Sequence, residues 1–202
     1  MPRKLILPTA ALVFAILAVW VTSGGAVSFD AAIRTAVHSR ATPVATGFFQ
    51  AITMLGSEWC MVPLGALAFW WVWTAGRRRS AVAIPVVTFS AELACQLLKL
   101  AFHRFRPEVY FGLAPAETYS FPSGHAFVST VFYGFLAAIL FGGRVAALAG
   151  AGILLLLIGF SRVYLGYHYP SDVLGGWACA AVWLSLPLTQ PSARRIPPGP
   201  RT

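Results

Sequence analysis

The sequence has few charged residues. Only 10% of its 202 residues are Asp, Glu, Lys or Arg, whereas roughly 25% is typical of soluble domains. Hydrophobic residues make up 58% and the mean hydropathy is +0.73, which excludes an ordinary soluble domain. No polar block is long enough to fold separately. We therefore expect a single membrane domain over residues 1–190, followed by a basic, Pro-rich cytoplasmic tail over 191–202.

Cysteine and acidic residues are also scarce. Cys60, Cys95 and Cys179 lie in apolar stretches without C-x2-C spacing, so neither a disulfide framework nor a cysteine zinc site is indicated. The net charge is +9, but the basic residues cluster at the ends of apolar runs. There they indicate membrane topology, not a nucleic-acid partner.

Six apolar stretches approach the roughly 20 residues that a helix needs to cross a bilayer core of about 30 Å. We expect an all-α polytopic membrane protein with six transmembrane helices, near 5–24, 58–76, 80–101, 125–142, 145–162 and 172–190. Hydrophobic residues also recur at helical spacing between the first two spans, which predicts short interfacial helices in this first outer loop. The start of the chain resembles a signal peptide as well, and its cleavage would leave the remaining topology unchanged.

Basic residues outside these spans are unevenly divided between the two sides. Nine lie on one side: Arg3, Lys4, Arg77, Arg78, Arg79, Arg144, Arg194, Arg195 and Arg201. The positive-inside rule places this side, with both termini, in the cytoplasm. The loops 103–123 and 163–171 then face the extracytoplasmic side of a cell (inner) membrane.

Ionisable residues gather at the outer ends of the predicted spans. A charge costs about 2.5–3.5 kcal/mol at the centre of a membrane helix, so charges in or beside a span require an explanation. The three clusters are Lys99, Arg106 and Pro107 in KLAFHRFRP; Pro122, Ser123, Gly124 and His125 in FPSGHAF; and Ser161, Arg162, His168 and Asp172 in SRVYLGYHYPSD.

Five of these residues predict a phosphate-binding pocket. Lys99, Arg106 and Arg162 supply three cations, and the planar guanidinium matches phosphate oxygens. Ser123 and Gly124 begin a predicted helix, where backbone N–H groups and the helix dipole favour an anion.

Two histidines and one aspartate indicate how a bound phosphate would be transferred. A neutral His168 can attack phosphorus while Asp172 holds its other ring N–H, which gives a phosphohistidine intermediate. His125 can protonate the leaving oxygen and later take a proton from water. Three cations would repel a divalent ion and already neutralise the phosphate, so we expect no metal and no cofactor.

The three clusters resemble the K-x6-R-P, P-S-G-H and S-R-x5-H-x3-D pattern of the type 2 phosphatidic acid phosphatases, a family of membrane lipid phosphatases. Every specified position is filled. The resemblance implies a six-helix enzyme that hydrolyses lipid phosphates or diphosphates without a metal. It also implies His168 as nucleophile, Asp172 as its partner, His125 as acid, and phosphate binding by the five residues named above.

The expected partners are membrane lipids and a lipid-phosphate substrate, with undecaprenyl diphosphate first and phosphatidylglycerophosphate, phosphatidic acid and lipid A phosphate after it. Two alternatives remain: a serine hydrolase in which Ser123 is the nucleophile, and a lipid-phosphate carrier without turnover. Three further residues are interpreted as structural: Arg104 and His103 as interfacial polar residues, and Glu92 as an acid within the third span that pairs with a polar group of the bundle or is itself protonated.

Overall fold

The computed structural model describes residues 5–116 and 118–186, so the predicted tail over 191–202 lies outside the described residues. Within the described residues every regular element is an α-helix. The helices are α1 (Ile6–Thr22), α2 (Val27–His38), α3 (Pro43–Leu55), α4 (Glu58–Thr74), α5 (Arg78–Phe102), α6 (Gly124–Phe141), α7 (Val145–Tyr164) and α8 (Pro170–Ser185).

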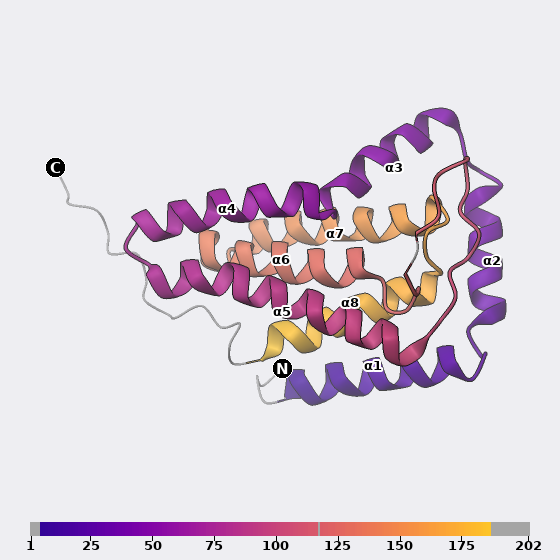
Figure 1. The fold of residues 1–202 in the computed structure, drawn as a ribbon, viewed down its shortest axis with the longest axis horizontal. Coiled ribbons are helices and arrows are strands. Elements are labelled where there is room, and N and C mark those ends of the chain that lie inside the picture. Colours follow the sequence, from indigo (N-terminus) through magenta and orange to yellow (C-terminus); the bar gives the residue numbers. More distant parts are fainter. Residues whose placement is uncertain (1–4, 117, 187–202) are drawn as a thin grey trace.

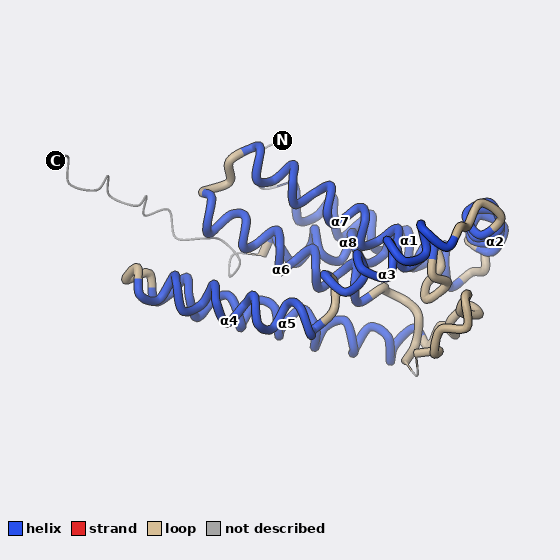
Figure 2. The backbone as a smooth tube through the Cα atoms, turned by 90° about the horizontal axis from the view of Figure 1, so that it is seen from above, coloured by secondary structure: helices blue, strands red, loops and turns tan. Residues whose placement is uncertain are grey.

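Helix α6 lies at the centre of the bundle and packs against α5, α7 and α8, while α1 covers α8 and α4 covers α5. Phe127, Val131, Phe132 and Phe135 of α6 contribute to the main buried cluster. Helix α2 runs across one end of the bundle (Figure 1) and is seen end-on in the perpendicular view (Figure 2). Helices α2 and α3 lie between the first two predicted spans, where short helices were expected.

The predicted count of six spans is not confirmed. By length and hydropathy, three described helices qualify as membrane spans, α5, α6 and α7, or up to five if each bent pair forms one span. Helices α1 and α4 have 17 residues and α8 has 16, which at 1.5 Å per residue is about 25 Å and shorter than a typical bilayer core. The bends are 88° between α1 and α2 and 44° between α3 and α4.

Local sequence explains where the helices at the α2 end of the bundle begin and end. Helix α5 ends at Phe102, and the next residue, His103, has a left-handed backbone (φ 48°) that turns the chain. Ser123 caps α6 by accepting a hydrogen bond from the backbone N–H of Ala126. Helix α8 begins with Pro170 in its first turn, where a missing N–H costs nothing.

Candidate active site

The antiparallel order of α5 to α8 brings the predicted site residues to one end of the bundle. The end of α5, the start of α6, the end of α7 and the start of α8 all lie at the end that α2 crosses (Figure 1). These helix ends and the loops beside them carry the eight residues predicted from the sequence: Lys99, Arg106, Ser123, Gly124, His125, Arg162, His168 and Asp172.

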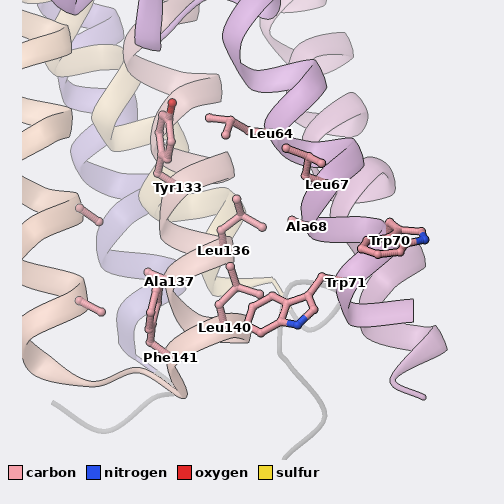
Figure 3. Close-up of a pocket in the computed structure, with 12 residues that line it drawn as sticks. Leu64, Leu67, Ala68, Trp70, Trp71, Tyr133, Leu136, Ala137, Leu140 and Phe141 are labelled. Atoms are coloured by element: carbon pink, nitrogen blue, oxygen red, sulfur yellow. The ribbon is translucent and has the colours of Figure 1, made fainter. Parts of the chain in front are cut away.

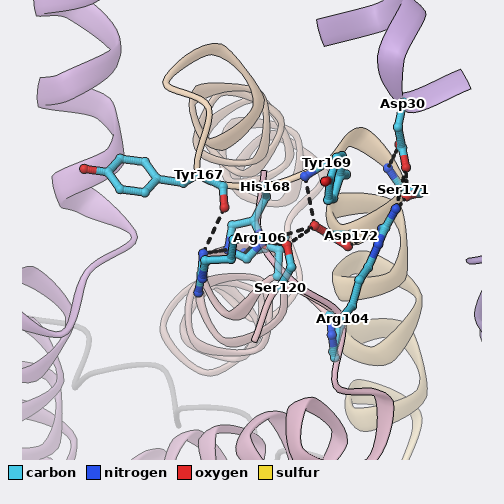
Figure 4. Close-up of polar contacts among 12 residues, drawn as sticks. Asp30, Arg104, Arg106, Ser120, Tyr167, His168, Tyr169, Ser171 and Asp172 are labelled. Carbon is cyan, nitrogen blue, oxygen red and sulfur yellow. Dashed lines mark hydrogen bonds and ion pairs between the residues drawn. The ribbon is translucent and has the colours of Figure 1, made fainter. Parts of the chain in front are cut away.

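His168 and Asp172 form a buried pair (Figure 4). The Nδ1 atom of His168 lies 3.4 Å from Oδ2 of Asp172, and the two residues are 1% and 0% exposed. Their separation of four residues bridges the loop after α7 and the first turn of α8. The hydroxyl of Ser120 lies between them, because it donates to Oδ2 of Asp172 and is 3.4 Å from Nδ1 of His168.

The other ring nitrogen of His168 faces a cation. Nη1 of Arg106 is 3.1 Å from Nε2 of His168. A guanidinium can only donate, so Nε2 must be the unprotonated nitrogen and Nδ1 carries the ring proton. This tautomer directs the Nε2 lone pair towards the cations and the Nδ1–H towards Asp172.

The surroundings keep the His168 ring neutral. Burial, followed by the positive charges of Arg106, Arg162 and Lys99, holds the pKa of His168 well below its usual value of 6.5. A ring with a lowered pKa retains its lone pair at neutral pH. His168 is therefore in the protonation state that a nitrogen nucleophile requires.

Asp172 is held by contacts on both carboxylate oxygens. Oδ2 accepts the backbone N–H of Tyr169 at 2.8 Å and the hydroxyl of Ser120, while Oδ1 accepts a hydrogen bond from Arg104. The contact with Tyr169 also completes a capping box at the start of α8. The carboxylate therefore has little freedom to rotate away from His168.

Two of the three predicted cations share one acceptor residue in the loop before α6. Arg106 donates to the carbonyl and the hydroxyl of Thr118 at 2.6 and 2.9 Å, and Nζ of Lys99 is 3.3 Å from the same hydroxyl. Arg106 also donates to the carbonyl of Tyr167 at 2.9 Å. Thr118 thus holds the two cations side by side.

The third cation is positioned by α3 and by the loop after α7. Nη1 of Arg162 donates to the hydroxyl of Thr53 at 2.7 Å, and its guanidinium lies 4.2 Å from the ring centroid of Tyr167. The Nε atom of Arg162 is buried and has no partner among the described residues. A buried N–H without an acceptor is costly, and a phosphate oxygen would satisfy it.

The start of α6 lies beside these cations. Lys99 lies against this helix start, because a Cβ atom placed on Gly124 would be 3.8 Å from its Nζ. His125 follows in the first turn of α6, close enough to Arg162 and His168 to interact with them electrostatically. The backbone N–H of Ser123 donates to the carbonyl of Asp172 at 3.0 Å, which ties the start of α6 to the start of α8.

A glycine makes the turn that carries His168. Gly166 has a φ of +84°, and a Cβ there would lie 2.8 Å from the backbone nitrogen of Tyr110 and 2.9 Å from the carbonyl oxygen of Glu108. The neighbouring carbonyl of Leu165 accepts the Tyr110 N–H at 3.1 Å. The loop from α5 to α6 is thereby packed directly against the turn before His168.

The interpretation of Arg104 as an interfacial residue is wrong. Its side chain is only 16% exposed and pairs with both Asp30 and Asp172. Sequence reasoning also missed Asp30, Ser120, Thr118 and Thr53. Asp30 lies 142 residues before Asp172, and small hydroxyl residues are too common for their position to be informative.

Within the part of the chain that the structure describes, His103 and Glu92 contact neither His168 nor Asp172. His103 is exposed at the end of α5, and its ring lies 4.7 Å from that of Tyr119. Glu92 accepts a hydrogen bond from Gln96 one turn along α5.

A separate apolar groove of about 550 Å³ lies between α4, α6 and α7 (Figure 3). Its lining includes Leu64, Trp70, Trp71, Tyr133, Leu136 and Phe141. None of the eight predicted site residues lines this groove, which is therefore separate from the cationic cluster.

Comparisons with known proteins identify the family. Residues 80–196 match the sequence model of the PAP2 superfamily, and the chain belongs to this superfamily, as the three sequence clusters predicted. It is 29% identical to phosphatidylglycerophosphatase B of Bacillus subtilis over 83% of this chain and 85% of that protein. It is 26% identical to an undecaprenyl-diphosphatase of Sulfolobus acidocaldarius over 86% and 85%.

A solved structure agrees with this assignment. The crystal structure of a transmembrane PAP2-type phosphatidylglycerolphosphate phosphatase from Bacillus subtilis superimposes with a TM-score of 0.82 at 27% identity, covering 89% of this chain and 93% of that one. The chain is therefore a membrane protein of a phosphatase family, and it is a hydrolase.

Proposed function

We propose that this protein removes the terminal phosphate from a lipid phosphate or diphosphate through a phosphohistidine on His168. The observation that carries the proposal is the position of the ring between Arg106 at Nε2 and Asp172 at Nδ1. The contact with Arg106 leaves the lone pair on Nε2, and the contact with Asp172 places a carboxylate oxygen against Nδ1–H on the other side of the ring.

In the first step, the Nε2 lone pair of His168 attacks phosphorus. The bond between that phosphorus and the oxygen of the departing lipid alcohol or lipid phosphate breaks as the N–P bond forms, and His125, which must be protonated at this step, gives its proton to the departing oxygen. The ring becomes positively charged, and the carboxylate of Asp172 stabilises that charge through Nδ1–H.

In the second step, the oxygen of a water molecule attacks the phosphohistidine. The N–P bond breaks, His125 takes a proton from the water, and inorganic phosphate leaves with His168 neutral again. Lys99, Arg106 and Arg162 balance the charge on the phosphoryl oxygens in both steps. We propose that these cations make a metal ion unnecessary.

The proposed arrangement in the membrane follows the distribution of basic residues. Six spans would place both termini in the cytoplasm and the pocket at the extracytoplasmic face of a cell membrane. Among substrates, phosphatidylglycerophosphate now stands beside undecaprenyl diphosphate, because relatives named for each align over more than four fifths of this chain. Both present a terminal phosphate on a membrane-anchored group.

The serine-hydrolase alternative has little support. Ser123 is fully buried and its hydroxyl accepts a hydrogen bond from the N–H of Ala126 as a helix cap. The carrier alternative does not require a paired histidine and aspartate. Neither accounts for the tautomer of His168.

The test is phosphate release by the full-length protein in detergent with EDTA. The substrate panel is phosphatidylglycerophosphate, undecaprenyl diphosphate, phosphatidic acid and lipid A phosphate. We expect turnover on at least one lipid, its loss in His168→Ala, and its retention in Arg40→Gln, which alters an exposed arginine outside the site. Binding without phosphate release would favour the carrier, and dependence on added metal would contradict the metal-free pocket.

A further inference from the structure

Arg104 joins two buried carboxylates from distant parts of the chain. Its Nη2 is 2.7 Å from Oδ2 of Asp30 on α2, and its Nη1 donates to Oδ1 of Asp172 on α8 (Figure 4). Asp30 is 1% exposed and Asp172 is fully buried. A continuous ionic chain therefore runs from His168 through Asp172 and Arg104 to Asp30.

Asp30 also binds the start of α8 directly. Its Oδ1 accepts the backbone N–H of Ser171 at 2.9 Å, and its Oδ2 accepts the Ser171 hydroxyl at 2.6 Å. Backbone N–H groups in the first turn of a helix have no partner within the helix, so a carboxylate there satisfies one and complements the dipole. The residue that follows Ser171 is Asp172, so Asp30 fixes the turn that carries the partner of His168.

Arg104 differs from Lys99, Arg106 and Arg162 in the groups that neutralise its charge. Two carboxylates neutralise it, and Nη1 donates a further hydrogen bond of 2.8 Å to the Ser171 hydroxyl. Its guanidinium also lies 4.2 Å from the ring centroid of Tyr169. Burial lowers the pKa of Arg104, but Asp172 and Asp30 outweigh this and raise it overall. Arg104 is therefore charged, and its hydrogen bonds go to the two carboxylates and to Ser171.

We infer that Asp30 and Arg104 are positioning residues for phosphoryl transfer, which hold the ionised carboxylate of Asp172 against Nδ1–H of His168. The inference rests on the proposed function and extends it to α2, which lies outside the family match over residues 80–196. Neither residue touches the reacting phosphate; both act through Asp172.

A purely structural role would also make these residues important, since removing one partner of a buried ion pair is strongly destabilising. The dependence of turnover on pH separates the two roles. In Arg104→Gln the loss of a positive charge makes Asp172 easier to protonate and His168 easier to charge, so the acidic limb of the kcat profile moves to higher pH. In Asp30→Asn the charge of Arg104 is less compensated, so the limb moves to lower pH.

The experiment measures kcat and KM against pH for the full-length protein in detergent, using whichever lipid phosphate the wild type hydrolyses. The variants are Arg104→Gln, Arg104→Lys and Asp30→Asn, with Arg40→Gln and Glu58→Gln as exposed controls. We expect Arg104→Gln to lower kcat about 10- to 100-fold with KM within about threefold, as removal of an orienting partner does elsewhere. Asp30→Asn should lower kcat less than Arg104→Gln does, and Arg104→Lys should retain part of the kcat that Arg104→Gln loses.

Wild-type kcat and pH profiles in Arg104→Gln and Asp30→Asn would overturn the inference. So would limbs that move in the same direction, or losses of kcat that match the loss of folded protein seen by gel filtration and leave the profile unmoved. If the wild type releases phosphate and His168→Ala does not, these results refute the positioning role alone. A wild type that hydrolyses no lipid on the panel would instead refute the proposed function.

Discussion

Arg106 and His168 share one contact: Nη1 of the guanidinium lies 3.1 Å from Nε2 of the imidazole. The cation thus lies on the side of the ring that would face phosphorus in the proposed attack. When a phosphate enters, its oxygens can take over the Arg106 donors and release the Nε2 lone pair towards phosphorus. In the proposed mechanism, Arg106 orients the free ring and then binds the phosphate that the ring attacks.

The first prediction concerns the covalent intermediate. Replacing His168 with Gln should lower phosphate release at least about 1000-fold, because the nucleophile is lost while the electrostatic pocket remains. Wild-type protein quenched with base during turnover of a ³²P-labelled lipid should retain label that is stable in base and released in acid, as for a phosphorus–nitrogen bond. Label on His168→Gln, or none on the wild type at any quench time, would contradict the assignment.

The second prediction separates turnover from binding. Asp172→Asn should lower kcat by about three to four orders of magnitude, as loss of tautomer control does in an Asp–His pair of another enzyme class. KM should change little, because Asp172 faces Nδ1 of His168 and not the cations. Steady-state kinetics on the best lipid test this, and a rise in KM with unchanged kcat would show that Asp172 serves binding instead.

The third prediction concerns the dependence of stability on pH. An unfolded histidine takes up a proton near pH 6.5, whereas burial and then Arg106 and Arg162 lower the pKa of His168 in the folded protein. Between these two pKa values the unfolded chain binds more protons, so stability falls as pH drops below about 6.5. His168→Gln lacks this group, and its Tm should fall less than the wild-type Tm between pH 7.5 and 5.0. Equal falls would mean that His168 is not held neutral by the fold.

The fourth prediction concerns the support of Arg162. Thr53→Val removes the acceptor for Nη1 but keeps the shape of the side chain, and Arg162→Lys removes the planar fork. Arg162→Lys should weaken competitive inhibition by inorganic vanadate about 10- to 100-fold, because a charged, buried hydrogen bond contributes about 1.5–3 kcal/mol. Thr53→Val should have a smaller effect of the same sign. Thr46→Val, on the same helix but bonded to Tyr164, is the control.

Sequence patterns predicted those parts of the site that depend on local spacing. Asp172 follows His168 by four residues and lies in the first turn of α8, so the pair could be read from a short segment. Arg106 could be predicted in the same way, because the K-x6-R-P pattern fixes its distance in sequence from Lys99. The helix positions also followed from hydropathy, although the lengths of α1, α4 and α8 leave the span count open.

The remaining site residues are set by contacts between distant segments. Arg104 and Arg106 are identical in type and two residues apart, yet one faces two carboxylates and the other faces His168. The two side chains reach different partners because of the course that the backbone takes after His103. Asp30 has no local signal, because its partners Arg104 and Ser171 lie 74 and 141 residues away.

The last prediction tests the contact between α6 and α8. A Cβ on Gly176 would lie 2.7 Å from the carbonyl oxygen of Ser123 and 2.8 Å from Cβ of Ala126, so Gly176→Ala must push the start of α6 away from α8. Overpacking of this kind costs about 1–3 kcal/mol, more than the roughly 1 kcal/mol that alanine gains over glycine in a helix. We expect a lower Tm and, because Ser123 and Gly124 move with the helix, vanadate inhibition weakened about 10-fold.

Gly150→Ala is the matched control for this substitution. Gly150 also lies within a helix, α7, but it is exposed and a Cβ there would meet nothing within 4 Å. Its Tm should be equal to or above that of the wild type, and its kinetics should be unchanged. If Gly176→Ala behaved like Gly150→Ala, α6 and α8 would not be in the close contact that places Ser123 beside Asp172, and the geometry of the phosphate pocket would have to be revised.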